Sequence, residues 1–148
     1  MKKFLLILTM LVMMLPSMCF ADPVITSDSR TFNPLTGVYD LQGHVFVQFP
    51  AHDTTLTITG DATKVLLYAM EVHGQGNIHL SFGDMSFACD KVDVYHSDRT
   101  AYVNGNLVFN DSSNKITADS GSYCWKTKIA AFHGNVAYNV MEKQITAQ

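Results

Sequence analysis

Gly105-Asn106-Leu107-Val108-Phe109 is one of four copies of a motif in which a glycine and a polar residue precede an alternating apolar stretch. The other copies are Gly43-His44-Val45-Phe46-Val47, Gly76-Asn77-Ile78-His79-Leu80 and Gly134-Asn135-Val136-Ala137-Tyr138. The last three copies begin at the evenly spaced positions 76, 105 and 134, and the first begins slightly farther from its neighbour, at position 43. A fixed period of about 29 residues is typical of folds in which similar units stack on one another.

A second motif keeps the same period. Its copies are Ile58-Thr59-Gly60-Asp61, Phe87-Ala88-Cys89-Asp90, Ile116-Thr117-Ala118-Asp119 and Ile145-Thr146-Ala147-Gln148, and they begin at the evenly spaced positions 58, 87, 116 and 145. The four extra residues of the first unit therefore fall between its two motifs, near residues 49–54. Two motifs in one register predict a repeat of about 29 residues along the chain.

Alternation of apolar and polar residues predicts strands with one buried face. In the first unit Val45, Val47 and Phe49 share one face, and His44 and Phe46 lie on the other. The stretch 24–28 echoes the second motif and predicts a degenerate first strand, and the cluster 33–37 predicts a turn. No stretch keeps apolar residues at helical spacing, so we expect an all-β fold with almost no helix.

Stacking the units in register produces columns of residues that remain mostly apolar from unit to unit. Such columns are required when no unit can bury its apolar face alone. The columns are Val45, Ile78, Leu107 and Val136; Val47, Leu80, Phe109 and Tyr138; Ile58, Phe87, Ile116 and Ile145; and Leu41, Gly74, Val103 and Phe132.

Residues 1–21 have the features of a secretory signal. Lys2 and Lys3 precede the apolar run 4–15, and Cys19-Phe20-Ala21 has small residues where a signal peptidase reads them. We expect cleavage after Ala21, which leaves residues 22–148 as a single domain in an exported protein. An apolar run of this length is short for a membrane span, and an uncleaved anchor is the alternative.

The net charge bears on the kind of partner, and the cysteine positions bear on whether a disulfide forms. Without Lys2 and Lys3 the chain retains 8 basic and 13 acidic residues, so its net charge near −5 argues against a nucleic-acid partner. In the repeat register Cys89 and Cys124 are displaced by six positions, or about 20 Å along a strand. A disulfide tolerates about 7 Å between Cα atoms, so we expect both thiols to be free unless the chain bends between their columns.

Motifs for catalysis are missing from the sequence. The 6 histidines are scattered without metal-ligand spacing, and no phosphate-binding loop or nucleophile elbow occurs, so we expect no enzyme, no cofactor and no metal site. The aspartates Asp61, Asp90 and Asp119 form a polar column just after each buried strand. We expect them to be turn residues that bond nearby backbone amides.

These motifs resemble the OstA-like superfamily, and within it the LptA-like periplasmic lipopolysaccharide-transport proteins. The matching residues are Ser27-Asp28, Tyr39-Asp40-Leu41-Gln42-Gly43-His44-Val45, Gly105-Asn106-Leu107, Ile116-Thr117-Ala118-Asp119 and Ala131-Phe132-His133-Gly134-Asn135-Val136. The resemblance covers nearly all of residues 22–148 and implies a β-jelly roll, with folded-over antiparallel sheets around an apolar trough.

The resemblance also implies a carrier function in the periplasm. The trough would shield the lipid A acyl chains of lipopolysaccharide on the way to the outer membrane, with no cofactor. Partners would be inner- and outer-membrane transport components with related jelly-roll domains, and copies of the chain would associate end to end. The trough candidates are Val45, Val47, Ile58, Ile78, Leu80, Phe87, Val103, Leu107, Phe109, Ile116, Phe132, Val136 and Tyr138.

Two alternatives to the carrier remain open at the level of sequence. The apolar columns also fit a closed core with no room for a ligand. In that case the chain would be a structural or interaction module of the cell envelope that binds no lipid. If the leader stays attached, the chain would instead be a membrane-tethered, LptC-like relative.

Overall fold

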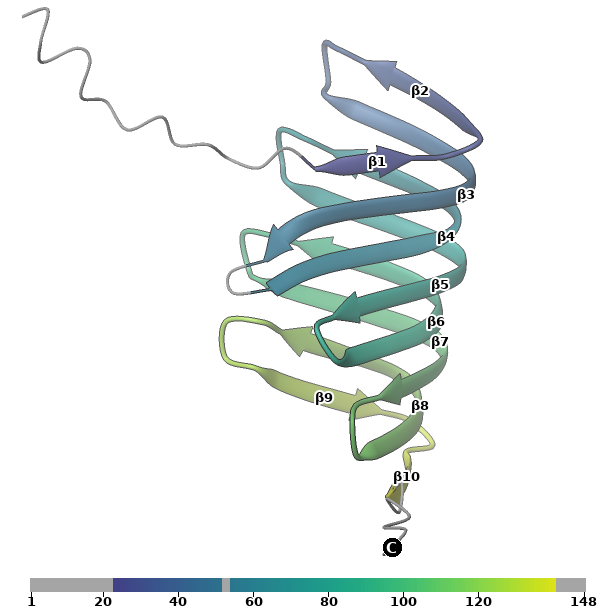
Figure 1. Ribbon diagram of the computed structural model, residues 1–148, viewed down its shortest axis with the longest axis vertical. Coiled ribbons are helices and arrows are strands. Elements are labelled where there is room, and N and C mark those ends of the chain that lie inside the picture. Colours follow the sequence, from purple (N-terminus) through teal and green to yellow (C-terminus); the bar gives the residue numbers. More distant parts are fainter. Residues whose placement is uncertain (1–22, 52–53, 141–148) are drawn as a thin grey trace, which may run out of the picture.

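In the computed structural model, which describes residues 23–51 and 54–140, every regular element is a β-strand (Figure 1). The predicted all-β class is therefore confirmed for these residues. The leader 1–21 and the last copy of the second motif lie outside the described residues. The strands are β1 Val24–Thr26, β2 Ser29–Asn33, β3 Val38–Ala51, β4 Thr54–Leu66, β5 Glu71–Phe82, β6 Met85–Tyr95, β7 Thr100–Asn110, β8 Asn114–Cys124, β9 Ile129–His133 and β10 Ala137–Val140.

The strands form one antiparallel sheet in the order β1-β3-β4-β5-β6-β7-β8-β10. At the two ends, β2 also pairs with β3 and β9 also pairs with β8. From β3 to β8 each strand pairs with the next one along the chain, so each repeat contributes one long hairpin. The stacked hairpins make an elongated molecule (Figure 1).

The long strands bend where the glycine motif lies. The pairing register shifts between Gln75 and Ile78 in β5, and Gly76 and Asn77 have φ values of 79° and 47°. Two consecutive residues in the left-handed region turn the strand sharply, which explains the glycine. A Cβ at Gly76 would also lie 2.7 Å from Asp61 Oδ2, so a side chain has no room there.

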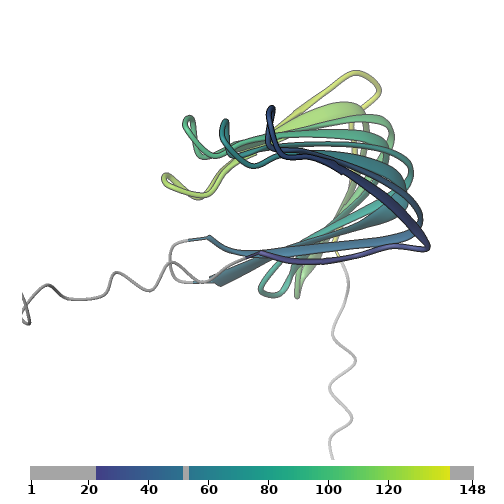
Figure 2. The same cartoon turned by 90° about the horizontal axis from the view of Figure 1, so that it is seen from above.

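Because these bends repeat from strand to strand, the sheet folds over into an open C (Figure 2). The C has two arms that face one another and a mouth between their edges. The β1 arm contains β1, β10 and residues 45–51, 54–59, 78–82, 85–88, 107–110 and 114–118. The β2 arm contains β2, β9 and residues 38–42, 62–66, 71–75, 91–95, 100–104 and 120–124.

A ladder of side-chain hydrogen bonds runs along the bend. In each repeat an aspartate carboxylate is bonded to the polar side chain that follows the glycine of the next copy, 16 residues later. The expectation that these aspartates bond backbone amides is thus corrected, because the left-handed backbone turns the following side chain toward the carboxylate. The pairs are Asp28 with His44 (2.6 Å), Asp61 with Asn77 (2.7 Å), Asp90 with Asn106 (2.8 Å) and Asp119 with Asn135 (2.9 Å).

The first unit matches the sequence prediction in part. The predicted degenerate first strand is β1, and the predicted turn cluster connects β2 to β3. The strand β2 was not predicted, since all five of its residues are exposed and show no alternation. The four extra residues lengthen the first hairpin, because β3 and β4 have 14 and 13 residues whereas β5 and β6 have 12 and 11.

Candidate lipid-binding trough

Inward-facing side chains of the β1 arm form one apolar row along the whole molecule. Val47 pairs with Ile58, Ile58 with Leu80, and the same register continues to the last strand. Two of the predicted columns therefore interleave into a single row, because each hairpin places one motif beside the other. The row is Ile25, Val47, Ile58, Leu80, Phe87, Phe109 and Ile116, and the register continues to Tyr138, which is exposed at the end of the sheet.

The β2 arm supplies the facing row, which contains the fourth predicted column. Two glycines and one hydroxyl interrupt its apolar surface. The Thr63 side chain is 4% exposed, and its Oγ1 has no hydrogen-bond partner among the described residues. The row is Leu41, Thr63, Gly74, Val92, Val103, Gly121 and Phe132.

The structure brings most of the predicted trough residues together between the arms. Ile116 and Phe132 are half-buried and pack against this core. The nine that are fully buried are Val45, Val47, Ile58, Ile78, Leu80, Phe87, Val103, Leu107 and Phe109.

Two predicted residues do not lie in the interior. Val136 and Tyr138 are 53% and 59% exposed, although their columns predict burial. They belong to the last copy of the glycine motif, where β10 is a short strand at the end of the sheet. The Tyr138 hydroxyl donates to Asn114 Oδ1 at 2.5 Å, so this side chain makes a polar contact at the sheet's end.

Aromatic side chains join the two arms across the interior. The ring centroids of Phe82 in the β1 arm and Tyr123 in the β2 arm are 5.0 Å apart. Farther along, Phe109 and Phe132 make a similar contact at 5.3 Å. These contacts are side-chain contacts alone, because the sheet's hydrogen bonds run along each arm and around the bend. The arms can therefore separate without breaking strand pairing.

A cavity of about 330 Å³ opens at the mouth between the arms. Its size is near the lower end of small-molecule sites, which span roughly 300–1,000 Å³. Apolar side chains dominate the lining, with one acidic and one basic side chain at the turns. The lining residues are Ala51, Thr54, Phe82, Gly83, Asp84, Met85, Tyr123, Trp125 and Lys128.

Sequence reasoning missed the β2-arm wall of this cavity. Tyr123 and Trp125 are buried, and they flank the half-buried Cys124. Their alternation with Cys124 is the strand signal that could have identified them. The Trp125 ring lies 5.7 Å from Phe82, so the tryptophan closes the mouth end of the interior.

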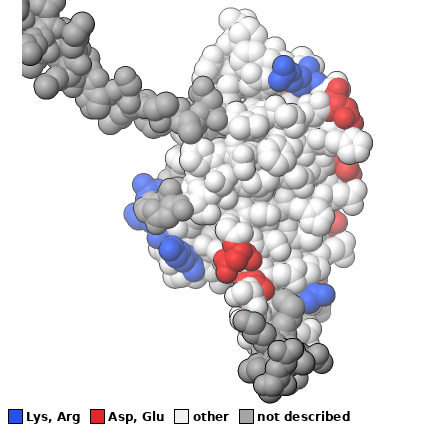
Figure 3. All heavy atoms as spheres, in the orientation of Figure 1, with Lys and Arg blue, Asp and Glu red and all other residues white. Residues whose placement is uncertain are grey.

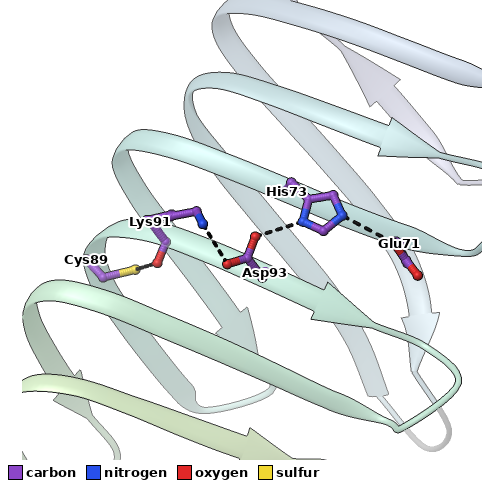
Figure 4. A network of polar contacts seen from close by, with 5 residues as sticks. All are labelled: Glu71, His73, Cys89, Lys91 and Asp93. Carbon is purple, nitrogen blue, oxygen red and sulfur yellow. Dashed lines mark hydrogen bonds and ion pairs between the residues drawn. The ribbon is translucent and has the colours of Figure 1, made fainter.

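The outer face of the β2 arm carries a polar network (Figure 4). His73 lies between two carboxylates, with Nδ1 2.7 Å from Asp93 Oδ1 and Nε2 3.3 Å from Glu71 Oε2. Lys91 Nζ lies 3.0 Å from the other oxygen of Asp93. Burial raises the pKa of the Asp93 carboxyl, but hydrogen bonds from His73 and Lys91 outweigh burial and hold the pKa below its usual value. An ionised Asp93 is suited to holding this face together.

The two described cysteines are free, as the repeat register predicts. Burial raises the pKa of the Cys89 thiol to about 11. Hydrogen bonding with Thr127, first through its side chain, lowers the pKa of Cys124 to about 7. In the described ranges no cluster of three His, Cys, Asp or Glu side chains is placed to hold a metal ion, and no helix has the length and apolarity to cross a membrane.

This architecture defines an LptA-like β-jelly roll, in which an antiparallel sheet folds over an apolar interior. The solved structure of LptH from Pseudomonas aeruginosa, described as the LptA-homologous periplasmic component of a lipopolysaccharide transport device, is similar with a TM-score of 0.71. The match covers 82% of this chain and 96% of LptH at 10% sequence identity, so it shows a shared fold. No protein-family model and no curated protein sequence matches the chain.

Proposed function

We propose that this protein is a periplasmic carrier that binds lipopolysaccharide and shields its acyl chains between the two arms. The observation that carries the proposal is the unbroken apolar row from Ile25 to Phe109 and beyond, which faces a second row across an interior whose mouth is closed by none of the described strands. The fold shared with LptH supports it. The function requires binding and release only, so we assign no catalytic residue.

The energetics favour a continuous apolar path. An acyl chain of a dozen carbons costs on the order of 10 kcal/mol in water, at about 0.8 kcal/mol per methylene. The interior can offset this cost only if the arms part and exchange contacts such as Phe82 with Tyr123 for contacts with the lipid. That exchange replaces one dispersion contact by another of similar strength, so it changes the free energy little.

Photocrosslinking in cells that make lipopolysaccharide tests the carrier function. A photoreactive amino acid replaces Phe82 at the mouth, Phe109 in the buried row or half-buried Phe132, and Tyr102 on the outer face is the matched aromatic control. We expect lipopolysaccharide adducts at the three inward positions and none at Tyr102. Protein adducts alone, or equal labelling at Tyr102, would contradict the proposal.

The finer parts of the proposal concern partners. The sheet ends at β1 and β2 on one side and at β9 and β10 on the other (Figure 1). Strand addition at these edges would join copies end to end, or join the chain to inner- and outer-membrane transport components with related jelly rolls. Sedimentation over a range of concentrations tests self-association, which requires a sedimentation coefficient that rises with concentration.

A scaffold of the cell envelope is the second candidate function. It is favoured by the packing of the interior, where Phe82 and Phe87 are 2% and 0% exposed. For the scaffold, photocrosslinks would form with protein at the sheet edges and never with lipid. The tethered, LptC-like alternative depends on residues 1–21, and the mass of the exported protein distinguishes it.

A further inference from the structure

One edge of the mouth carries apolar side chains that point into solvent. This edge, the β2-arm rim, consists of the four turns 34–37, 67–70, 96–99 and 125–128 and the adjoining Ile129. Leu35 is 90% exposed, Tyr68 71%, Ile129 64% and Met70 54%. Apolar side chains gathered at turn tips are costly in water and typically mark an interaction surface.

Backbone hydrogen bonds connect these turns into a continuous ridge. Leu67 N donates to Gly37 O at 2.9 Å, and His96 N donates to Met70 O at 3.1 Å. Trp125 N completes the series by donating to Arg99 O at 3.0 Å. The tips follow one another along the upper arm of the C in Figure 2. The ridge is therefore held in place before it meets a partner.

The two edges of the mouth differ in charge. The turns of the β2-arm rim contain Arg99, Lys126 and Lys128 against a single Asp98, which leaves a formal charge of +2 (3 − 1). The opposite edge presents Asp84 and Asp111 in its described turns. In Figure 3 some of the basic side chains lie at the left margin, whereas acidic side chains lie over the turns in front and along the right margin. The apolar ridge is thus also the basic edge.

We propose that the β2-arm rim docks on the surface of a bilayer that contains anionic lipids. Exposed apolar tips enter the interface between headgroups and acyl chains, and neighbouring Lys and Arg side chains pair with lipid phosphates. Tyr68 suits this position, since its ring is apolar and its hydroxyl, bonded to Pro34 O at 2.9 Å, is polar. Docking in this way turns the mouth toward the bilayer.

This surface does not depend on the trough holding lipid, so the two proposals can fail separately. Flotation of the protein, as cells export it, with vesicles of phosphatidylethanolamine and one-quarter phosphatidylglycerol is the test. The double variant Leu35→Ser, Met70→Ser removes two exposed tips and should weaken binding roughly tenfold. The double variant Val24→Ser, Tyr102→Ser removes exposed apolar side chains outside the rim and should bind as the unchanged protein does.

Charge reversal checks the electrostatic part. The variant Lys126→Glu, Lys128→Glu should weaken binding to the anionic vesicles, and high salt should do the same because it screens exposed charges. Vesicles of phosphatidylcholine alone should bind the unchanged protein more weakly than the anionic vesicles. Equal binding by the rim variants and the control would overturn the proposal.

If the leader 1–21 stays attached to the exported protein and makes every variant float, flotation no longer separates the variants. Hydrogen exchange then tests the proposal. We expect anionic vesicles to slow amide exchange in the turns 34–37 and 67–70 and to leave the turn 111–113 unchanged. Protection of the turn 111–113 on the opposite edge, or no protection of the turns 34–37 and 67–70, would overturn the proposal. Lipopolysaccharide adducts in the interior without protection of the rim would leave the carrier function standing and remove only the membrane contact.

Discussion

Asn106 donates its side-chain amide to Asp90 Oδ2 at 2.8 Å, and this bond spans the bend of one repeat. Asn106 has a φ of 47°, a conformation that asparagine adopts more readily than most residues. The residue therefore both shapes the bend and bonds across it. The same relationship recurs in the neighbouring repeats, so the bend is held at regular intervals along the molecule.

Removing this contact should destabilise the protein measurably. Asn106→Ala removes this hydrogen bond, and it also places an alanine in the left-handed region, where the side chain cannot offset the backbone strain by a hydrogen bond. Together the two effects should lower the free energy of unfolding by about 1–3 kcal/mol. Urea unfolding measures it, and Asn104→Ala on the exposed outer face is the matched control. Once Asn106 is alanine, Asp90→Ala should add little. Additive losses would show that the two residues act independently.

The first repeat should respond to pH, because His44 stands where the later copies have asparagine. The hydrogen bond to Asp28, followed by its charge, raises the pKa of His44 above 6.5. A raised pKa in the folded state stabilises the protein fully below pH 6.5, and this contribution is lost as the pH rises through the folded-state pKa. Thermal melting across that range should show the loss, and His44→Asn should abolish it. An unchanged pH profile in His44→Asn would contradict this assignment.

The unpartnered hydroxyl of Thr63 offers a stabilising substitution. Thr63→Val keeps the shape of the side chain and removes a buried polar atom that has no hydrogen-bond partner in the described structure, so unfolding should cost about 1–2 kcal/mol more. Urea unfolding measures the gain. Thr57→Val is the comparison, since Gln48 Nε2 lies 3.5 Å from the Thr57 hydroxyl and no gain is expected there. A destabilised Thr63→Val would mean that the hydroxyl is satisfied in solution.

The two described thiols should differ in reactivity. Cys124, with a pKa of about 7, should be alkylated by iodoacetamide at a rate that rises with pH through neutrality, because the thiolate is the nucleophile. Buried Cys89, with a pKa of about 11, should react only after unfolding. Mass spectrometry of the alkylated peptides measures both rates. If Cys89 were modified in the native state at a rate comparable to that of Cys124, the arms would have to open widely without a ligand.

Tryptophan fluorescence should report ligand entry, since the chain has 1 tryptophan and it lines the mouth cavity. If acyl chains enter between Trp125 and Phe82, the emission should shift and saturate as lipid A is added. Phe82→Ala should alter the affinity, whereas Tyr102→Ala on the outer face should leave the titration unchanged. An emission spectrum that stays constant while lipid A binds would place the lipid elsewhere.

Sequence alone determined the parts of this protein that depend on local periodicity. Alternation predicted strands with one buried face, and the repeat register correctly placed Leu41, Val103 and Phe132 in one row. These properties follow from the pleat, which puts every second side chain on the same face. The strand β2 was not predicted, because all five of its residues are exposed and its sequence does not alternate between a buried and an exposed face.

Only the tertiary structure decided what faces what across the interior. The contact of Phe82 with Tyr123, the wall that Trp125 adds to the cavity and the alignment of Leu35 with Met70 along one rim join residues from different repeats. The exposure of Val136 and Tyr138 likewise depends on their place at the end of the stack. Periodicity assigns a residue to a face, whereas the fold of the sheet at its bend determines which faces meet and where the stack ends.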